Sequence, residues 1–115
     1  MRMMLTVAVL GLITAGAARA DCMPPNDSVQ IPDGSKATRD EMIAAQRAIK
    51  AFDAAVQTYG DCLKQEQDAK IAAGGDRGKV TAAYSKLNNE QVDKVQKYAD
   101  KFNVELRAFK AKSPG

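Results

Sequence analysis

Cys22 and Cys62 are the residues whose chemistry is easiest to predict, because they are the only two cysteines in the chain. They do not form the Cys-x-x-Cys spacing that is typical of a thiol redox centre. An even pair of cysteines in an exported protein typically forms a disulfide. The loop that they close is long, and the chain-entropy model gives such a crosslink about 4 kcal/mol of stabilisation. We therefore predict a structural Cys22–Cys62 disulfide.

Residues 1–20 have the pattern of a secretory signal peptide, which supports the oxidising compartment that this disulfide needs. Arg2 supplies a positive start, Met3 to Ile13 form a short apolar stretch, and Ala18-Arg19-Ala20 is a small-x-small cleavage site. The apolar run is shorter than the ~20 residues that a spanning helix needs, and no second run follows it. We expect a periplasmic or secreted protein with no transmembrane segment after signal removal.

Candidate catalytic and metal-binding groups are few. The chain has no histidine, which is the commonest general base and metal ligand. Neighbouring carboxylates occur at Asp40-Glu41 and at Glu66 with Asp68. The first pair is explained by helix capping and we place the second on a solvated face, whereas a general acid needs an apolar pocket. We expect no enzyme activity, no catalytic residue, no cofactor and no metal site.

Lys94, Lys97 and Lys101 recur at steps of three and four, so they share one face of a helix. Such a face can contact lipid phosphates, nucleic acid or an acidic protein. Glu90 and Asp93 dilute its charge, however, and the face has no aromatic side chains for stacking on bases. We expect a solvated face, with contact to an anionic envelope surface as the alternative and no nucleic acid partner.

Residues 21–37 are predicted to form an extended tail. The consecutive prolines Pro24-Pro25 exclude a helix, and Ile31-Pro32-Asp33-Gly34 is typical of a turn in which Gly34 adopts a positive φ. The tail up to Ser35 has three acidic and no basic residues, whereas residues 77–112 have nine basic and four acidic ones. The sequence therefore favours charge pairing between the tail and the end of the chain.

A capping box then marks the start of a long helix, with Thr38 as N-cap and Glu41 three positions later. Apolar residues follow at alternating steps of three and four, which is a heptad seam typical of a coiled coil. Its members are Met42, Ala45, Ile49, Phe52, Val56, Tyr59 and Leu63. Gly74-Gly75 is the predicted end of this helix.

A second long helix is predicted from about Lys79 to Lys112. Its apolar residues are Val80, Tyr84, Leu87, Val92, Val95, Tyr98, Ala99, Phe102, Leu106 and Phe109. The step from Leu87 to Val92 breaks the heptad spacing, and Asn88-Asn89 lie at this step. We interpret the irregularity as a shift of the buried stripe or as a short break in the helix.

The short link after Gly74 permits only an antiparallel return. The predicted fold is all-α: a signal peptide over residues 1–20, an extended tail over residues 21–37, and an antiparallel two-helix hairpin over residues 38–112. Cys62 lies far along the first helix, whereas Cys22 precedes that helix. The predicted disulfide therefore requires the tail to double back along the hairpin.

Several short motifs are spread over most of the chain after the signal peptide. They are Ile31-Pro32-Asp33-Gly34, Ala37-Thr38, Met42, Lys50-Ala51-Phe52, Cys62-Leu63, Phe102-Asn103 and Arg107-Ala108-Phe109-Lys110. In these motifs the chain resembles a family of small exported proteobacterial proteins of unknown function. The resemblance implies a periplasmic helical protein and transfers no catalytic residue.

These features favour a non-enzymatic helical hairpin that binds another macromolecule or itself. A small enzyme would need a pocket, which an antiparallel helix pair seldom makes. A lone hairpin leaves apolar flanks such as Ile43, Ile71 and Val104 partly exposed. Two hairpins pairing into a four-helix bundle would cover them, and so would a partner helix or peptide. The expected partner is a second copy, giving a homodimer, or an envelope protein.

Overall fold

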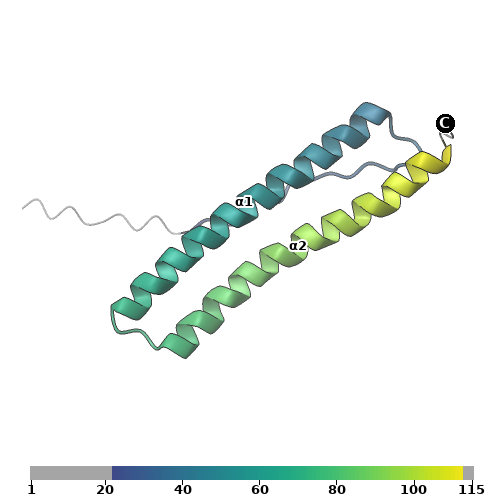
Figure 1. Ribbon diagram of the computed structural model, residues 1–115. Coiled ribbons are helices and arrows are strands. Elements are labelled where there is room, and N and C mark those ends of the chain that lie inside the picture. Colours follow the sequence, from purple (N-terminus) through teal and green to yellow (C-terminus); the bar gives the residue numbers. More distant parts are fainter. Residues whose placement is uncertain (1–21, 113–115) are drawn as a thin grey trace, which may run out of the picture.

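The computed structural model describes residues 22–112. It has two antiparallel helices, α1 (Arg39–Ala72) and α2 (Arg77–Lys112), joined by a short loop, with an extended tail before α1 (Figure 1). The predicted all-α hairpin is confirmed. The predicted signal peptide, residues 1–20, lies outside the described residues. So do Asp21 and the predicted cleavage site, which follows Ala20. Neither helix between residues 22 and 112 is long and apolar enough to cross a membrane.

Both ends of α1 are fixed by the local interactions that the sequence predicts. The Glu41 N–H donates to Thr38 Oγ1 at 3.2 Å, and the Thr38 N–H donates to Glu41 Oε2 at 3.3 Å, which completes the capping box. At the other end, Gly74 adopts a φ of 98°. The Gly74 and Gly75 N–H groups donate to the carbonyls of Ile71 and Lys70, at 3.0 and 2.9 Å. These bonds are the Schellman pattern that ends a helix at glycine.

The start of α2 lies at Arg77, two residues before the predicted Lys79. Asp76 is the reason, because its side chain caps the first turn: Asp76 Oδ1 accepts the Lys79 N–H at 2.8 Å. The Asp76 carbonyl accepts the Val80 N–H at 2.9 Å. The apolar pattern alone places the start near Val80, whereas Asp76 has the residue type and position of an N-cap and sets the start of the helix.

α2 runs without a break through Asn88-Asn89. The buried stripe does not shift there but continues in heptad steps from Tyr84 to Gln91, which are 7% and 6% exposed. Leu87 and Val92, expected in the stripe, are instead 41% and 47% exposed. Because the helix is continuous, its geometry alone determines which positions face α1. Gln91 occupies such a position and is buried, whereas Leu87 and Val92 do not.

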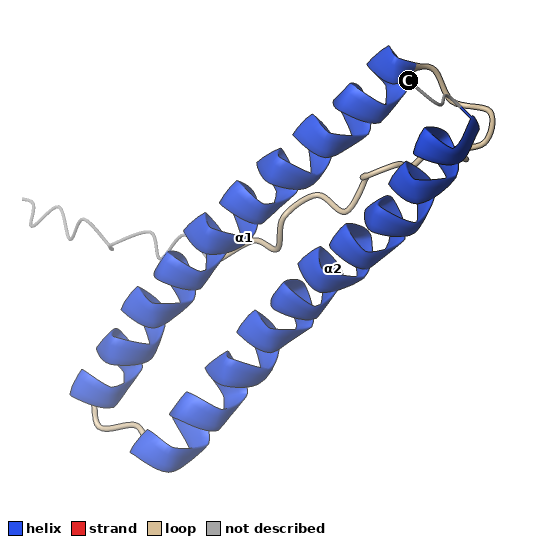
Figure 2. Cartoon of the chain, turned by 45° about the vertical axis from the view of Figure 1, so that its right-hand side comes forward, coloured by secondary structure: helices blue, strands red, loops and turns tan. Residues whose placement is uncertain are grey.

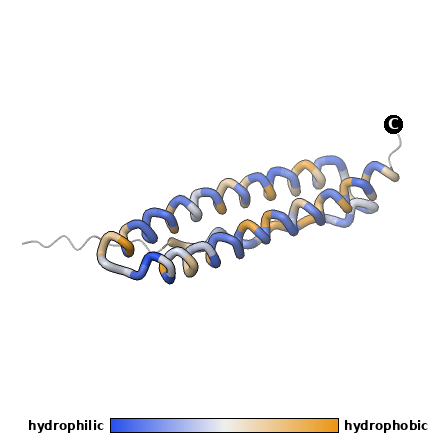
Figure 3. The backbone as a smooth tube through the Cα atoms, turned by 60° about the horizontal axis from the view of Figure 1, so that its bottom comes forward, coloured by the Kyte–Doolittle hydropathy of each residue, from blue (hydrophilic) through white to orange (hydrophobic). Residues whose placement is uncertain are grey.

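The core lies along the line where the two helices meet. Six of the seven predicted seam residues of α1 are buried, and Ile49 is half-buried. Apolar residues alternate with hydrophilic ones along both helices (Figure 3). Phe52 and Tyr98 pack edge to face, with ring centroids 5.4 Å apart, and a second cluster joins Tyr59, Leu63 and Tyr84. The buried surface of these aromatic side chains holds the helices together.

The tail lies along the gap between the helices and returns from the middle of the hairpin to the start of α1 (Figure 2). Cys22 and Cys62 form the predicted disulfide, with an S–S distance of 1.93 Å and a Cα–Cα distance of 5.8 Å. The tail therefore doubles back along the hairpin, as predicted. It covers one of the two grooves that flank the contact between the helices.

Candidate interaction surfaces

Glu66 joins the start of the tail to both helices. Its Oε1 accepts the Cys22 N–H at 3.3 Å, and its Oε2 accepts the Tyr84 hydroxyl at 3.0 Å. We expected this carboxylate on a solvated face, and that expectation is wrong for Glu66, which is half-buried. The tail and Tyr84 enclose it, while Asp68 is exposed as expected. Glu66 is therefore part of the disulfide anchor.

Asp27 anchors the middle of the tail to α2. Lys94 Nζ lies 3.4 Å from Asp27 Oδ2, and the Tyr98 hydroxyl donates to Asp27 Oδ1. The hydrogen bond from Tyr98, followed by the contact with Lys94, holds the pKa of Asp27 below its ordinary value. The same hydrogen bond raises the pKa of Tyr98. This contact is the charge pairing between tail and second helix that the sequence favours.

The pairing of Lys94 changes the predicted lysine face. Lys94 is half-buried against the tail, whereas Lys97 and Lys101 are exposed. Asp93 and Asp100 flank Lys97 at one helical turn on either side and are also exposed. Two lysines thus remain free of the tail on this face. Contact with an anionic envelope surface stays a prediction.

The Asp33-Gly34 turn fastens the end of the tail to the last part of α2. Asp33 Oδ1 accepts the Ser35 N–H at 2.9 Å and the Ser35 hydroxyl at 2.6 Å, and these bonds lower the pKa of Asp33. The Gly34 N–H donates to Glu105 Oε2 at 2.7 Å, and Lys112 Nζ donates to the Ala37 carbonyl. The predicted positive φ at Gly34 is wrong, since among residues 22–112 only Gly74 has one.

The face of the hairpin away from these tail contacts carries three hollows, which we together call the open groove. Both helices line all three, and no tail residue does. At the start of α1 the lining is Arg39, Met42, Ile43, Gln46, Phe102, Leu106 and Phe109. The third hollow, toward the loop, is lined by Gly60, Leu63, Lys64, Gln67, Tyr84, Ser85 and Asn88.

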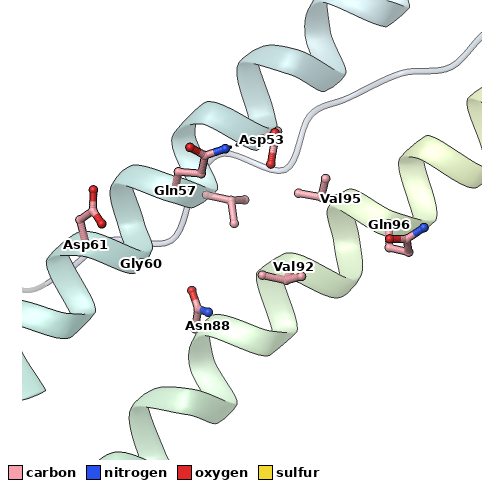
Figure 4. A pocket seen from close by; sticks show the side chains of 9 residues that line it. Asp53, Gln57, Gly60, Asp61, Asn88, Val92, Val95 and Gln96 are labelled. Carbon is pink, nitrogen blue, oxygen red and sulfur yellow. Dashed lines mark hydrogen bonds between the residues drawn. The ribbon is translucent and has the colours of Figure 1, made fainter.

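The central hollow of the open groove has a volume of about 440 Å³ (Figure 4). Three valines, Val56, Val92 and Val95, give it an apolar floor and wall. Its rim is polar and consists of Asp53, Gln57, Asp61, Asn88 and Gln96, with Gly60 between them. A Cβ on Gly60 would lie 2.9 Å from Asn88 Oδ1, so the glycine helps to keep the hollow open. Valines inside an amide and carboxylate rim suit the side chains of a docking helix.

The residue pattern of the sequence does not mark Gln57, Gly60 or Asn88 as residues of a binding surface. Their signal is positional, because Gln57 and Gly60 lie one residue beyond Val56 and Tyr59 of the predicted seam. Residues 22–112 contain no group of three or more histidine, cysteine, aspartate or glutamate side chains that could hold a metal ion. In comparisons with known proteins, no family model, no curated protein and no solved structure matches this chain.

Proposed function

We propose that this chain is an exported, non-enzymatic interaction protein that binds another macromolecule or a second copy of itself through the open groove. The proposal rests on one observation: the tail covers one of the two grooves between the helices and leaves the other exposed. The tail covers one groove and is held there by a disulfide, by Glu66 and by Asp27. The other groove keeps Val92 47% exposed at its centre.

Three further observations support export. The pattern of residues 1–20 is that of a signal peptide, and structural disulfides form and persist in oxidising compartments such as the periplasm. The resemblance to small exported proteobacterial proteins favours the same location. Together they support a periplasmic or secreted helical protein.

The alternative function is binding to an anionic envelope surface through the lysine face. The observation that favours it is the exposure of Lys97 and Lys101. The pairing of Lys94 with Asp27 weakens it, because the third lysine already has a partner. This alternative predicts binding to vesicles that contain anionic lipids, a strong decrease of binding with salt, and loss of binding in a Lys97→Glu, Lys101→Glu variant.

A matched pair of valines tests the proposed function. Val92 and Val104 both lie on α2 and are similarly exposed, at 47% and 52%, but only Val92 lines the central hollow. In the producing cell, Val92→Arg should abolish the crosslinked assemblies that contain this chain. Val104→Arg should leave them unchanged. Equal effects of the two variants, or no effect of either, would contradict the role of the open groove.

A further inference from the structure

We propose that a second copy of the chain binds to the open groove, so that the open grooves of the two copies face each other. A two-fold axis beside Val56 relates the copies, and α1 of one copy lies antiparallel to α1 of the other. This inference rests on the proposed function and specifies its partner. Its first support is the central hollow, which Val56 lines almost midway along α1. A two-fold axis there lets the valines and amides of one copy meet the same residues of the other.

The charges along the groove edge of α1 change sign near this midpoint. Arg39 and Lys50 occur in the first half, and Lys50 lies on the same stripe as Gln46 and Asp53, which line two of the hollows. Asp53, just before the midpoint, is the acidic residue of this half. Beyond the midpoint, Asp61 and Asp68 are acidic and Lys64 is basic. The first half of the edge is therefore mainly basic and the second half mainly acidic. Such an edge is complementary to a reversed copy of itself.

Lys50 and Asp61 are the pair that this arrangement brings together. An axis between residues 55 and 56 places Lys50 and Asp61 at the same distance from it, about 8 Å along the helix, on opposite sides. Lys50 of each copy then faces Asp61 of the other, and the symmetry makes this contact twice. Both side chains are exposed, and neither forms an ion pair or hydrogen bond within residues 22–112.

The opposite way of stacking two hairpins, with α1 over α2 of the second copy, is less favourable. Arg39 and Phe109 line the same hollow, so Arg39 lies level with the end of α2. Stacking α1 over α2 would therefore place Arg39 near Lys110 of the second copy. In the proposed arrangement α2 of one copy instead contacts α2 of the other. The contact is made through an uncharged edge formed by Ser85, Asn88, Val92 and Gln96. No like charges meet there.

Charge reversal tests this orientation, because each single variant repels itself and the two variants attract each other. We expect the wild-type chain to be a dimer in sedimentation equilibrium at micromolar concentration. Lys50→Asp and Asp61→Lys should each weaken the dimer at least tenfold. An equimolar mixture of the two variants should restore it as a heterodimer. The restored mixture also shows that both variants are folded.

Arg47→Asp is the matched control, since Arg47 is exposed on α1 one turn before Lys50 and lines none of the three hollows. It should leave the dimer unchanged. A monomeric wild type, unaffected single variants, an unrestored mixture or a weakened Arg47→Asp dimer would each overturn the inference. If the wild type is monomeric and Val92→Arg still abolishes assemblies with other macromolecules, the proposed function stands without this inference. If Val92→Arg abolishes nothing, the proposed function fails as well.

Discussion

The backbone of Gly34 lies directly against the backbone of Glu105, with no space for a side chain between them. A Cβ on Gly34 would lie 1.8 Å from the Glu105 carbonyl oxygen, and the Gly34 N–H donates to Glu105 Oε2 at 2.7 Å. The end of the tail can reach α2 this closely only because residue 34 is a glycine. This contact and the disulfide hold the tail at its two ends.

Gly34→Ala should displace the end of the tail and lower the free energy of unfolding by about 1–3 kcal/mol, as is typical of overpacking. The helices should remain, because α1 has its own capping box. Thermal unfolding followed by circular dichroism would measure the change. Gly78→Ala is the matched control, since the nearest atom to its Cβ would be Asp76 Oδ1 at an ordinary 3.5 Å. It should not destabilise the protein, and equal losses in both variants would contradict the role of the close approach.

Replacing both Cys22 and Cys62 by serine should release the start of the tail and keep most of the helix. The tail contains no helix, and although Cys22 packs against the cluster of Tyr59, Leu63 and Tyr84, the seam from Met42 to Val56 lies outside that cluster. The free energy of unfolding should fall by up to about 4 kcal/mol. Far-ultraviolet circular dichroism at low temperature should change little, whereas the melting temperature should drop. Loss of most of the helical signal would show that the disulfide is required for the hairpin itself.

The Asp27 contact predicts an acid-dependent stabilisation. Its pKa is lower in the folded protein than the ordinary 3.8, so its contribution is present above pH 3.8 and is lost as the pH falls through the folded value. Asp27→Asn should therefore remove part of the acid destabilisation below pH 3.8. Because the hydrogen bond from the Tyr98 hydroxyl is the largest single cause of the lowered Asp27 pKa, Tyr98→Phe should raise that pKa. Carboxyl titration by NMR would measure the change, and an Asp27 pKa that stays the same in Tyr98→Phe would contradict this assignment.

Gln91 predicts a stabilising substitution. Its Oε1 is buried and has no hydrogen-bond partner within residues 22–112. A buried oxygen without a partner costs about 1–3 kcal/mol, so Gln91→Leu should raise the stability by about 1 kcal/mol. Denaturant unfolding would measure the gain. The same substitution at exposed Gln65 should change the stability by less than about 0.5 kcal/mol. A destabilised Gln91→Leu protein would show that the amide has a partner or a specific packing role.

The features that could be predicted from the sequence are those that neighbouring residues determine. The capping box at Thr38, the glycine end of α1 and the seam from Met42 to Leu63 depend on residue types and spacing within one helix. The disulfide followed from the presence of only two cysteines. Once the disulfide and α1 were predicted, the return of the tail followed from chain length alone.

The features that were missed depend on contacts between distant segments. Gln91 is buried because α2 is continuous and turns this position toward α1, although a polar side chain is usually exposed to solvent. Glu66 is enclosed because Cys22 and Tyr84 approach it from outside α1. The open groove depends on which flank the tail covers, and periodicity within a helix does not encode that choice. Gly34 is needed for a close approach to Glu105 and not for the positive φ that its turn suggests.

The partner contacts the open groove, as proposed above, and not the outer surface of the hairpin. Site-specific photocrosslinking in the producing cell can distinguish these two surfaces, with the photoreactive residue at position 92 and, as a control, at position 104. We expect covalent adducts from position 92, to a second copy first of all, and none from position 104. Adducts from position 104 alone, or equal adducts from both positions, would contradict it.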